Sequence, residues 1–199
     1  MSSGKDKSIS REIAGKLEES ARIKSALAGS KVSEIEQMVN TIIAALKKGG
    51  KVVFFGNGGS AADAMHLAGE LVGHLKLERP AIPAIALTAN TSIITAIAND
   101  DGYETVFSRQ VEALVNKNDV VIAISTSGNS PNVIRAVTAA KAKGARTIGL
   151  TGGSGGKLAG VVDLALVVPS NDTQRIQEAH ITIGHIICEL VERMMAGAD

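Results

Sequence analysis

Short apolar runs alternate along this chain with segments of helical pattern, and this alternation most strongly constrains the fold. The runs are β-branched or aliphatic on both alternating faces, as expected of strands covered on two sides. They lie at residues 52–55, 84–87, 120–124, 147–150 and 164–168. Helical patterns lie between them at 61–75, 91–98, 104–115 and 131–143, with a short turn at 157–159. The alternation predicts an α/β fold, a five-stranded parallel doubly wound sheet with right-handed crossovers.

Longer helical patterns flank this core. Residues 9–48 predict two helices broken near residues 28–30, and residues 173–195 predict one more. The last helix is apolar over most of its circumference, and such a helix at the end of a small domain often packs against another subunit. We therefore expect a homo-oligomer of single-domain chains spanning residues 1–199. Its expected parts are a helical arm at 1–48, an α/β core at 49–170 and a C-terminal helix at 171–199.

Composition narrows the classes of partner. The chain has 21 basic and 20 acidic side chains, a net charge of +1, so it has no broad basic field for nucleic acid. Three Phe, one Tyr and no Trp argue against platforms that stack bases. The single Cys188 fits a reducing compartment. No apolar stretch approaches the ~20 residues of a membrane span. We expect a cytoplasmic protein with no membrane or nucleic-acid partner.

Two loops of small polar residues follow the first and third apolar runs, and each opens a helical pattern. The first is Gly56-Asn57-Gly58-Gly59-Ser60 and the second Ser125-Thr126-Ser127-Gly128-Asn129-Ser130. Free backbone N–H groups, the positive end of a helix dipole and hydroxyl donors hold a phosphate without many cations. In a sheet of flavodoxin-like order 2-1-3-4-5, both loops meet where the strand order reverses. The sequence therefore predicts a crevice that holds one phosphorylated small molecule.

Two pairs of polar side chains lie at helical spacing near these loops. His66 and Glu70 share one face of the helix that the first loop opens. Gln177 and His185, eight residues apart, share a stripe of the otherwise apolar last helix. Each pair also has an ordinary explanation, because an intrahelical pair can lie on a solvated face and a lone histidine is often satisfied in a core.

Other polar features have structural explanations of the same kind. The serines of the second loop could cap a helix. The glycine-rich residues 152–156 could be a flexible connection. His74 and His180 are assigned surface or structural roles by default. Separately, none of these features specifies a reaction.

Taken together, the motifs resemble a known family. Residues 56–66, from Gly-Asn-Gly-Gly-Ser to His66, are similar to the opening signature of the phosphoheptose isomerases. Residues 124–130 resemble the phosphate loop of the wider sugar-isomerase (SIS) domain family. Residues 175–180, followed by His185, resemble the C-terminal helix of the phosphoheptose isomerases. The resemblance runs in order from about residue 31 to residue 192.

The resemblance implies an aldose–ketose isomerase that converts sedoheptulose 7-phosphate into D-glycero-D-manno-heptose 7-phosphate through an enediol. Glu70 would be the base and His185 the acid, roles that suit a partly desolvated carboxylate and an imidazole titrating near neutrality. The implied enzyme is a homotetramer whose sites draw residues from neighbouring subunits. It needs no nucleotide cofactor. The substrate-binding residues that the resemblance implies are Asn57, Gly58, Gly59, Ser60, Asp63, Asp100, Ser125, Thr126, Ser127, Ser130 and Gln177.

Some members of the resembled family bind zinc, and the equivalent set here is His66, Glu70, Gln177 and His185. Imidazoles and carboxylates are good zinc ligands and a Gln amide is a weak one. Zn²⁺ would stabilise the enediolate oxygens as a Lewis acid. Two positions depart from the family pattern, because His74 stands where relatives usually carry arginine and Gln174 where some carry an acidic residue.

Three other functions compete with this interpretation. A non-catalytic SIS protein of the replication-initiator-associating type has nearly the same fold but lacks a carboxylate at the position of Glu70. SIS isomerases of another phosphosugar, such as arabinose 5-phosphate, commonly carry an extra regulatory domain. A transcription regulator with a SIS sensor would need a helix-turn-helix domain before Lys31, where too few residues are present.

Overall fold

The structure, a computed structural model, describes residues 3–197, and for residues 3–7 the backbone alone. Five strands form one sheet in the order β2-β1-β3-β4-β5, and each neighbouring pair is parallel. Both the predicted fold class and the predicted strand order are confirmed. The strands are β1 (Val52–Gly56), β2 (Ala84–Ala86), β3 (Val120–Ile124), β4 (Arg146–Gly152) and β5 (Leu164–Val168).

Helices connect and flank these strands close to the predicted positions. They are α1 (Ser3–Ser30), α2 (Val32–Lys47), α3 (Gly59–Val72), α4 (Thr91–Asp100), the 3-10 helix η1 (Tyr103–Thr105), α5 (Ser108–Leu114), α6 (Pro131–Ala142), α7 (Gly156–Val161) and α8 (Thr173–Ala196). The helix predicted at 104–115 is divided into η1 and α5. Phe107 lies at this break, buried and stacked on Phe55 of β1 with ring centroids 5.2 Å apart. Packing on the sheet therefore decides where this helix begins.

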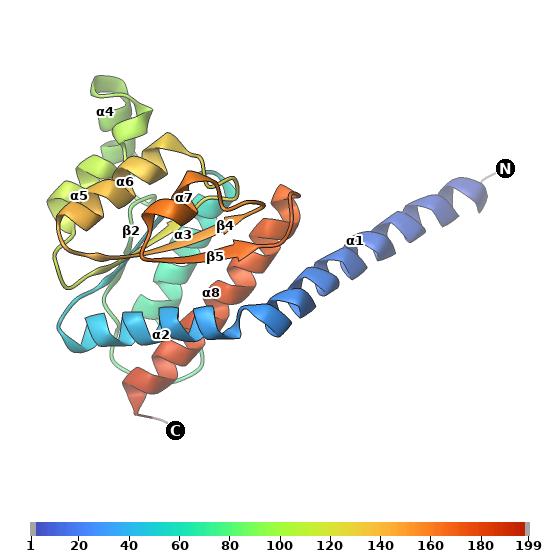
Figure 1. Cartoon of the computed structure of the whole chain (residues 1–199), viewed down its shortest axis with the longest axis horizontal. Coiled ribbons are helices and arrows are strands. Elements are labelled where there is room, and N and C mark those ends of the chain that lie inside the picture. The colour runs from blue at the N-terminus through green and yellow to red at the C-terminus, as the bar shows by residue number, and fades with distance from the viewer. Residues whose placement is uncertain (1–2, 198–199) are drawn as a thin grey trace.

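Helices cover both faces of the sheet (Figure 1). Alternate strand residues point to opposite sides, so Val52 and Phe54 pack under α2, α3 and α8, while Val53 and Phe55 pack under α5, α6 and α7. Because both faces are buried, the strands are apolar on consecutive residues rather than on alternate ones, with Arg146, Thr147 and Thr151 of β4 as polar exceptions. This explains why the strands are visible in the sequence as continuous apolar runs.

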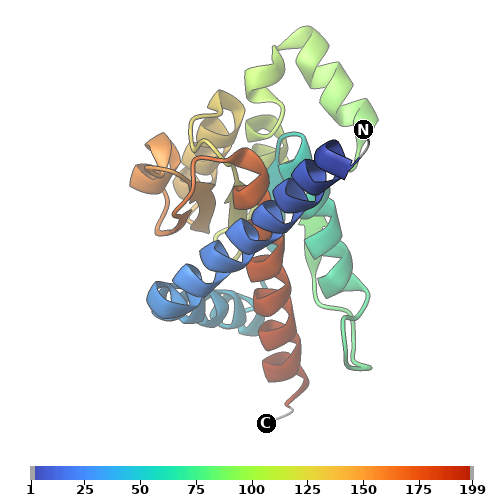
Figure 2. The same ribbon diagram turned by 90° about the vertical axis from the view of Figure 1, so that its right-hand side faces the viewer.

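The long helix that the rest of the chain covers less is α1 rather than α8, although α1 does contact α8 and α2. The apolar residues of α8 are largely covered by α2, α3 and the sheet, because α8 lies between them. In contrast, α1 extends past the sheet as an arm, and Figure 2, viewed toward its N-terminal end, shows it crossing α8. Its side chains Ile9, Ile13 and Leu17 lie exposed at spacings of four residues. None of the described helices is both long and apolar enough to cross a membrane.

Candidate active site

The two polar loops begin side by side because they follow neighbouring strands. Gly56 ends β1 and is paired in register with Ile124, which ends β3. A Cβ on Gly56 would lie 2.7 Å from both the Ile124 carbonyl oxygen and the Ser60 Cβ. Glycine is therefore required for the first loop to turn back over the edge of the sheet. The predicted meeting of the two loops at the switch point is confirmed.

An amide pair joins the first loop to α6, which the second loop opens. Asn57 and Asn132 exchange two hydrogen bonds of 2.9 Å through their side-chain amides, and the Tyr103 hydroxyl donates to Asn57 Oδ1 at 3.1 Å. Asn57 was predicted to contact sugar, and here its side chain holds the two loops together. Asn132 and Tyr103 were not predicted. The sequence shows only an Asn directly after Pro131, and its burial is visible only in the structure.

The second loop is shaped by its own hydroxyls and by residues 152–156. Ser125 Oγ lies 3.2 Å from Ser130 Oγ, and the Asn129 backbone N–H donates to Ser127 Oγ at 3.2 Å. A Cβ on Gly128 would lie 2.1 Å from the Gly155 carbonyl oxygen, so the two segments touch backbone to backbone. The interpretation of residues 152–156 as a flexible connection is therefore wrong, because these glycines allow a close contact that supports the phosphate loop.

A polar cavity of about 200 Å³ opens beside this contact. It lies between the carboxyl ends of the strands and the start of α8. Hydroxyl and amide groups line it, among them Thr126, Ser127, Ser154, Ser170 and Asn171. The second loop thus presents donors on an accessible surface.

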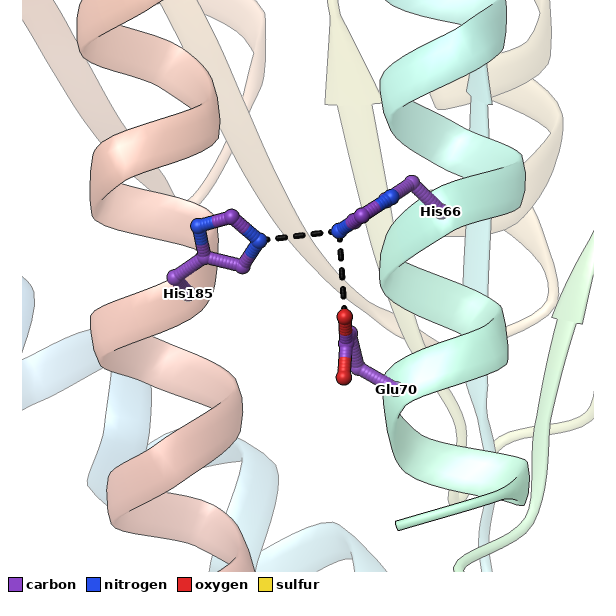
Figure 3. Close-up of side chains that lie close together, drawn as sticks. All are labelled: His66, Glu70 and His185. Atoms are coloured by element: carbon purple, nitrogen blue, oxygen red, sulfur yellow. Dashed lines mark hydrogen bonds and ion pairs between the residues drawn. The ribbon is translucent and has the colours of Figure 1, made fainter. Parts of the chain in front are cut away.

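The titratable side chains meet along the seam between α3 and α8 (Figure 3). His66 Nε2 lies 2.8 Å from His185 Nε2 and 3.0 Å from Glu70 Oε1. One ligand atom from each of the three side chains lies within 4.8 Å of the other two. A single Nε2 cannot donate to both neighbours with one hydrogen, so two or three lone pairs converge here. Such a donor set suits a cation or a proton in transit.

A glycine on α8 brings these helices together at the level of the histidines. A Cβ on Gly184 would lie 2.6 Å from both methyl carbons of Leu67. One turn further on, the Cys188 thiol lies 3.8 Å from the Leu67 carbonyl oxygen. This close approach lets His185 reach His66 across the seam. All three cluster residues belong to one chain, so no second subunit is needed to assemble them.

Two further predicted residues line the same seam nearer the sheet. A Cβ on Gly59 would lie 2.5 Å from Gln177 Nε2, so the Gln177 amide packs against the first turn of α3. Asp63 is half-buried, and its Oδ2 is buried with no hydrogen-bond partner among the described residues. Burial raises the pKa of Asp63 above its ordinary value, although His66 and His185 act in the opposite direction. These side chains lie between the phosphate loops and the histidine cluster.

Within residues 3–197, no hydrogen bond or ion pair joins the Asp100 side chain to the site. Asp100 ends α4, which protrudes from the body of the chain, and its carboxylate is exposed and accepts from the Asn99 amide at 2.7 Å. The buried His180 and Cys188 are chemically quiet. Burial lowers the pKa of His180 to about 4 and raises the pKa of Cys188 to about 12. Neither group exchanges protons readily near neutral pH.

Comparison with known proteins identifies chains of similar sequence and fold. The SIS domain family matches residues 17–152. A phosphoheptose isomerase from Aquifex aeolicus is 56% identical over 177 residues, which are 89% of this chain and 93% of the relative.

Two solved structures are similar over nearly the whole chain. A phosphoheptose isomerase from Neisseria gonorrhoeae has a TM-score of 0.88 at 42% identity, covering 92% of this chain and 98% of its own. A phosphoheptose isomerase from Francisella tularensis has a TM-score of 0.89 at 38% identity, covering 92% and 97%.

Proposed function

The chain belongs to the phosphoheptose isomerase family of SIS-domain proteins, and from this membership we propose that it converts sedoheptulose 7-phosphate into D-glycero-D-manno-heptose 7-phosphate. It is a phosphosugar isomerase, as its relatives are. The observation that carries the proposal is the convergence of His66, Glu70 and His185 beside two loops suited to phosphate. Glu70 also argues against the non-catalytic alternative, which lacks this carboxylate.

In the proposed mechanism, the loops hold the phosphate and so orient the other end of the sugar. Ser60, Ser125, Thr126, Ser127 and Ser130 donate hydroxyl hydrogen bonds, and the starts of α3 and α6 supply backbone N–H groups. Binding energy from this remote group positions C1 and C2 at the seam. Gly58, Gly59, Asp63 and Gln177 lie along the path between the two regions, where sugar hydroxyls would pass.

Glu70 acts as the base and His185 as the acid. Glu70 removes a proton from C1 of the ketose and returns it to C2, while His185 moves the hydroxyl proton from O1 to O2. One C–H bond breaks and one forms, so the sugar changes isomer without any external oxidant or reductant. His66 contacts both groups and holds them at hydrogen-bonding distance. The enediol forms between these two transfers.

We also propose that His66, Glu70, Gln177 and His185 hold a Zn²⁺ ion. Two imidazoles and a carboxylate converge here, and these are the donor types that zinc prefers. When bound, the ion supplies Lewis-acid stabilisation of the enediolate oxygens.

A homotetramer is the assembly that we propose. The exposed stripe Ile9, Ile13 and Leu17 of α1 supports it, together with an apolar cavity of about 540 Å³ between α2 and α8. The lone buried Cys188 fits a cytoplasmic setting.

The test mixes purified protein with sedoheptulose 7-phosphate and follows the aldoheptose phosphate. We expect turnover, which Glu70→Gln abolishes while the oligomer stays intact. Glu189→Gln is the matched control, because Glu189 is an exposed carboxylate on α8. Absence of turnover in the wild type, with and without added zinc, would refute the assignment and favour a binding protein.

A further inference from the structure

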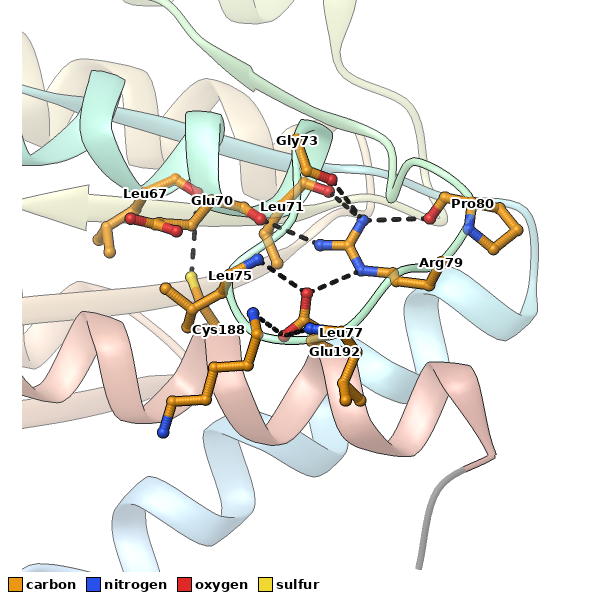
Figure 4. Close-up of polar contacts among 11 residues, drawn as sticks. Leu67, Glu70, Leu71, Gly73, Leu75, Leu77, Arg79, Pro80, Cys188 and Glu192 are labelled. Atoms are coloured by element: carbon orange, nitrogen blue, oxygen red, sulfur yellow. Dashed lines mark hydrogen bonds and ion pairs between the residues drawn. The ribbon is translucent and has the colours of Figure 1, made fainter.

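A buried ionic network lies at the far end of the seam between α3 and α8 (Figure 4). Its centre is Arg79, in the loop after α3, and Glu192, near the end of α8. Their side chains are 3% and 1% exposed, and Arg79 Nε lies 3.2 Å from Glu192 Oε1. Among the described residues, neither side chain forms a hydrogen bond or ion pair with the side chains of His66, Glu70 or His185. The network nevertheless binds the backbone at the end of α3 and in the loop that follows it, through a side chain that α8 carries.

Arg79 satisfies the end of α3. Its Nη2 donates to the Glu70 carbonyl oxygen at 3.0 Å, and its Nη1 donates to those of Leu71 at 2.8 Å and Gly73 at 3.0 Å. The last carbonyls of a helix have no intrahelical partner and carry the negative end of its dipole. A planar guanidinium offers five donors on three nitrogens in a fixed plane, whereas a lysine offers three donors on a single flexible nitrogen. Arg79 is thus bonded directly to the backbone of the proposed base.

Glu192 binds the segment that follows. Its carboxylate accepts from the backbone N–H groups of Leu75 at 2.9 Å, Lys76 at 2.8 Å and Leu77 at 3.3 Å. Burial alone would raise the pKa of Glu192, but these three donors and Arg79 hold it below its ordinary value. The carboxylate is therefore ionised and fully engaged. It fixes the loop after α3 to α8, seven residues and two helical turns beyond His185.

We propose that Arg79 and Glu192 are positioning residues for the isomerisation, holding Glu70 in register with His185. This inference rests on the proposed function. Gly184 sets the spacing of the helices at the histidines, and the Arg79–Glu192 network sets how far α3 is shifted along α8. Buried ion pairs contribute little net stability compared with apolar residues of the same volume. Geometry is what this pair supplies, because its bonds run to seven backbone groups at the end of α3 and in the loop that follows it.

The test compares kcat and KM for sedoheptulose 7-phosphate in Arg79→Lys, Glu192→Gln and Glu189→Gln. Lys76 and Glu189 join the same loop to the same helix at the surface, where they are 61% and 43% exposed, so Glu189→Gln is a matched control. We expect kcat to fall ten- to a hundredfold in the first two variants, the scale of a ~1 Å misplacement of catalytic groups. KM should change less than twofold, because the phosphate loops lie at the other end of α3. The control should leave both within twofold.

A second readout needs no turnover. The chain has four histidines, so the ¹⁵N signals of labelled histidine resolve His66 and His185 in metal-free protein. Both should shift in Arg79→Lys and stay in place in Glu189→Gln, and His180 should not move in either.

Each outcome decides the matter. An inactive wild type would refute the proposed function, whereas an active wild type with unchanged kcat in folded Arg79→Lys and Glu192→Gln would overturn the positioning role alone. If the variants lose activity only through a higher KM, with kcat unchanged, the positioning role is also overturned. If neither variant folds, the pair belongs to the folding core and the proposal fails.

Discussion

His180 makes the stability of this protein depend on pH between 8 and 5. His180 is a residue of α8 and is 1% exposed, and its Nε2 lies 3.1 Å from the Thr151 carbonyl oxygen. A carbonyl oxygen only accepts, so Nε2 carries the hydrogen and Nδ1 is the site of protonation. Nδ1 is buried without a hydrogen-bond partner among residues 3–197. An added proton there would create an unpaired buried charge.

The direction and size of the change in stability with pH follow from the pKa of His180. Burial lowers the pKa of His180 from 6.5 to about 4, and the Thr151 hydrogen bond opposes this only in part. Between these values the unfolded chain binds more protons than the folded one, so stability is lost as the pH falls through 6.5. At pH 5 the unfolded ring is almost fully protonated and the folded ring almost fully neutral. The loss relative to pH 8 is about 2 kcal/mol.

The assay is urea unfolding at pH 8 and pH 5, at one protein concentration and with a chelator present to remove metal linkage. His180→Gln keeps a donor for the Thr151 carbonyl and cannot titrate. Between pH 8 and pH 5, the free energy of unfolding should fall by about 2 kcal/mol less in this variant than in the wild type. His74→Gln removes an exposed ring, so its loss of unfolding free energy between pH 8 and pH 5 should equal that of the wild type. If wild type and His180→Gln lose stability in parallel, the burial argument is refuted.

Three substitutions probe the seam and the loops. Gly184→Ala places a Cβ 2.6 Å from Leu67, so it should lower the free energy of unfolding by ~1–3 kcal/mol and reduce kcat. Both should recover in part in a Leu67→Ala background. The control Gly69→Ala, whose Cβ meets no atom within 4 Å, should not lower the melting temperature. Gly59→Ala displaces only the tip of Gln177, so calorimetry should show little change while turnover falls. Asn132→Ala removes both hydrogen bonds to Asn57. An unsatisfied buried amide costs ~1–3 kcal/mol, so KM should rise about tenfold. Tyr103→Phe should raise KM less.

Local features were readable from the sequence. Strands buried on both faces are continuous apolar runs, and the break between α1 and α2 occurs where Gly29 and Ser30 interrupt the pattern. His66 and Glu70 could be paired because a helix brings residues four apart to one face. The last helix was predicted within one residue, whereas α1 begins at Ser3, six residues before the predicted start.

Contacts between distant segments were not readable. Asn132 pairs with Asn57, and Arg79 with Glu192, across 75 and 113 residues of chain, and no periodicity links such positions. The glycines at 152–156 read as flexible because a close backbone contact and a loose connection have the same composition.

The sequence by itself determined the order of strands and helices, the two polar loops and the residue types of the site. Those follow from short-range periodicity and from the chemistry of each side chain. Only the tertiary structure decided that α3 and α8 run side by side, close enough at Gly184 for His66 to meet His185. It also decided that α1, and not α8, leaves the apolar stripe Ile9, Ile13 and Leu17 exposed. The physical reason is that packing depends on how side chains far apart in the sequence fit together, and the local pattern of residues does not encode this fit.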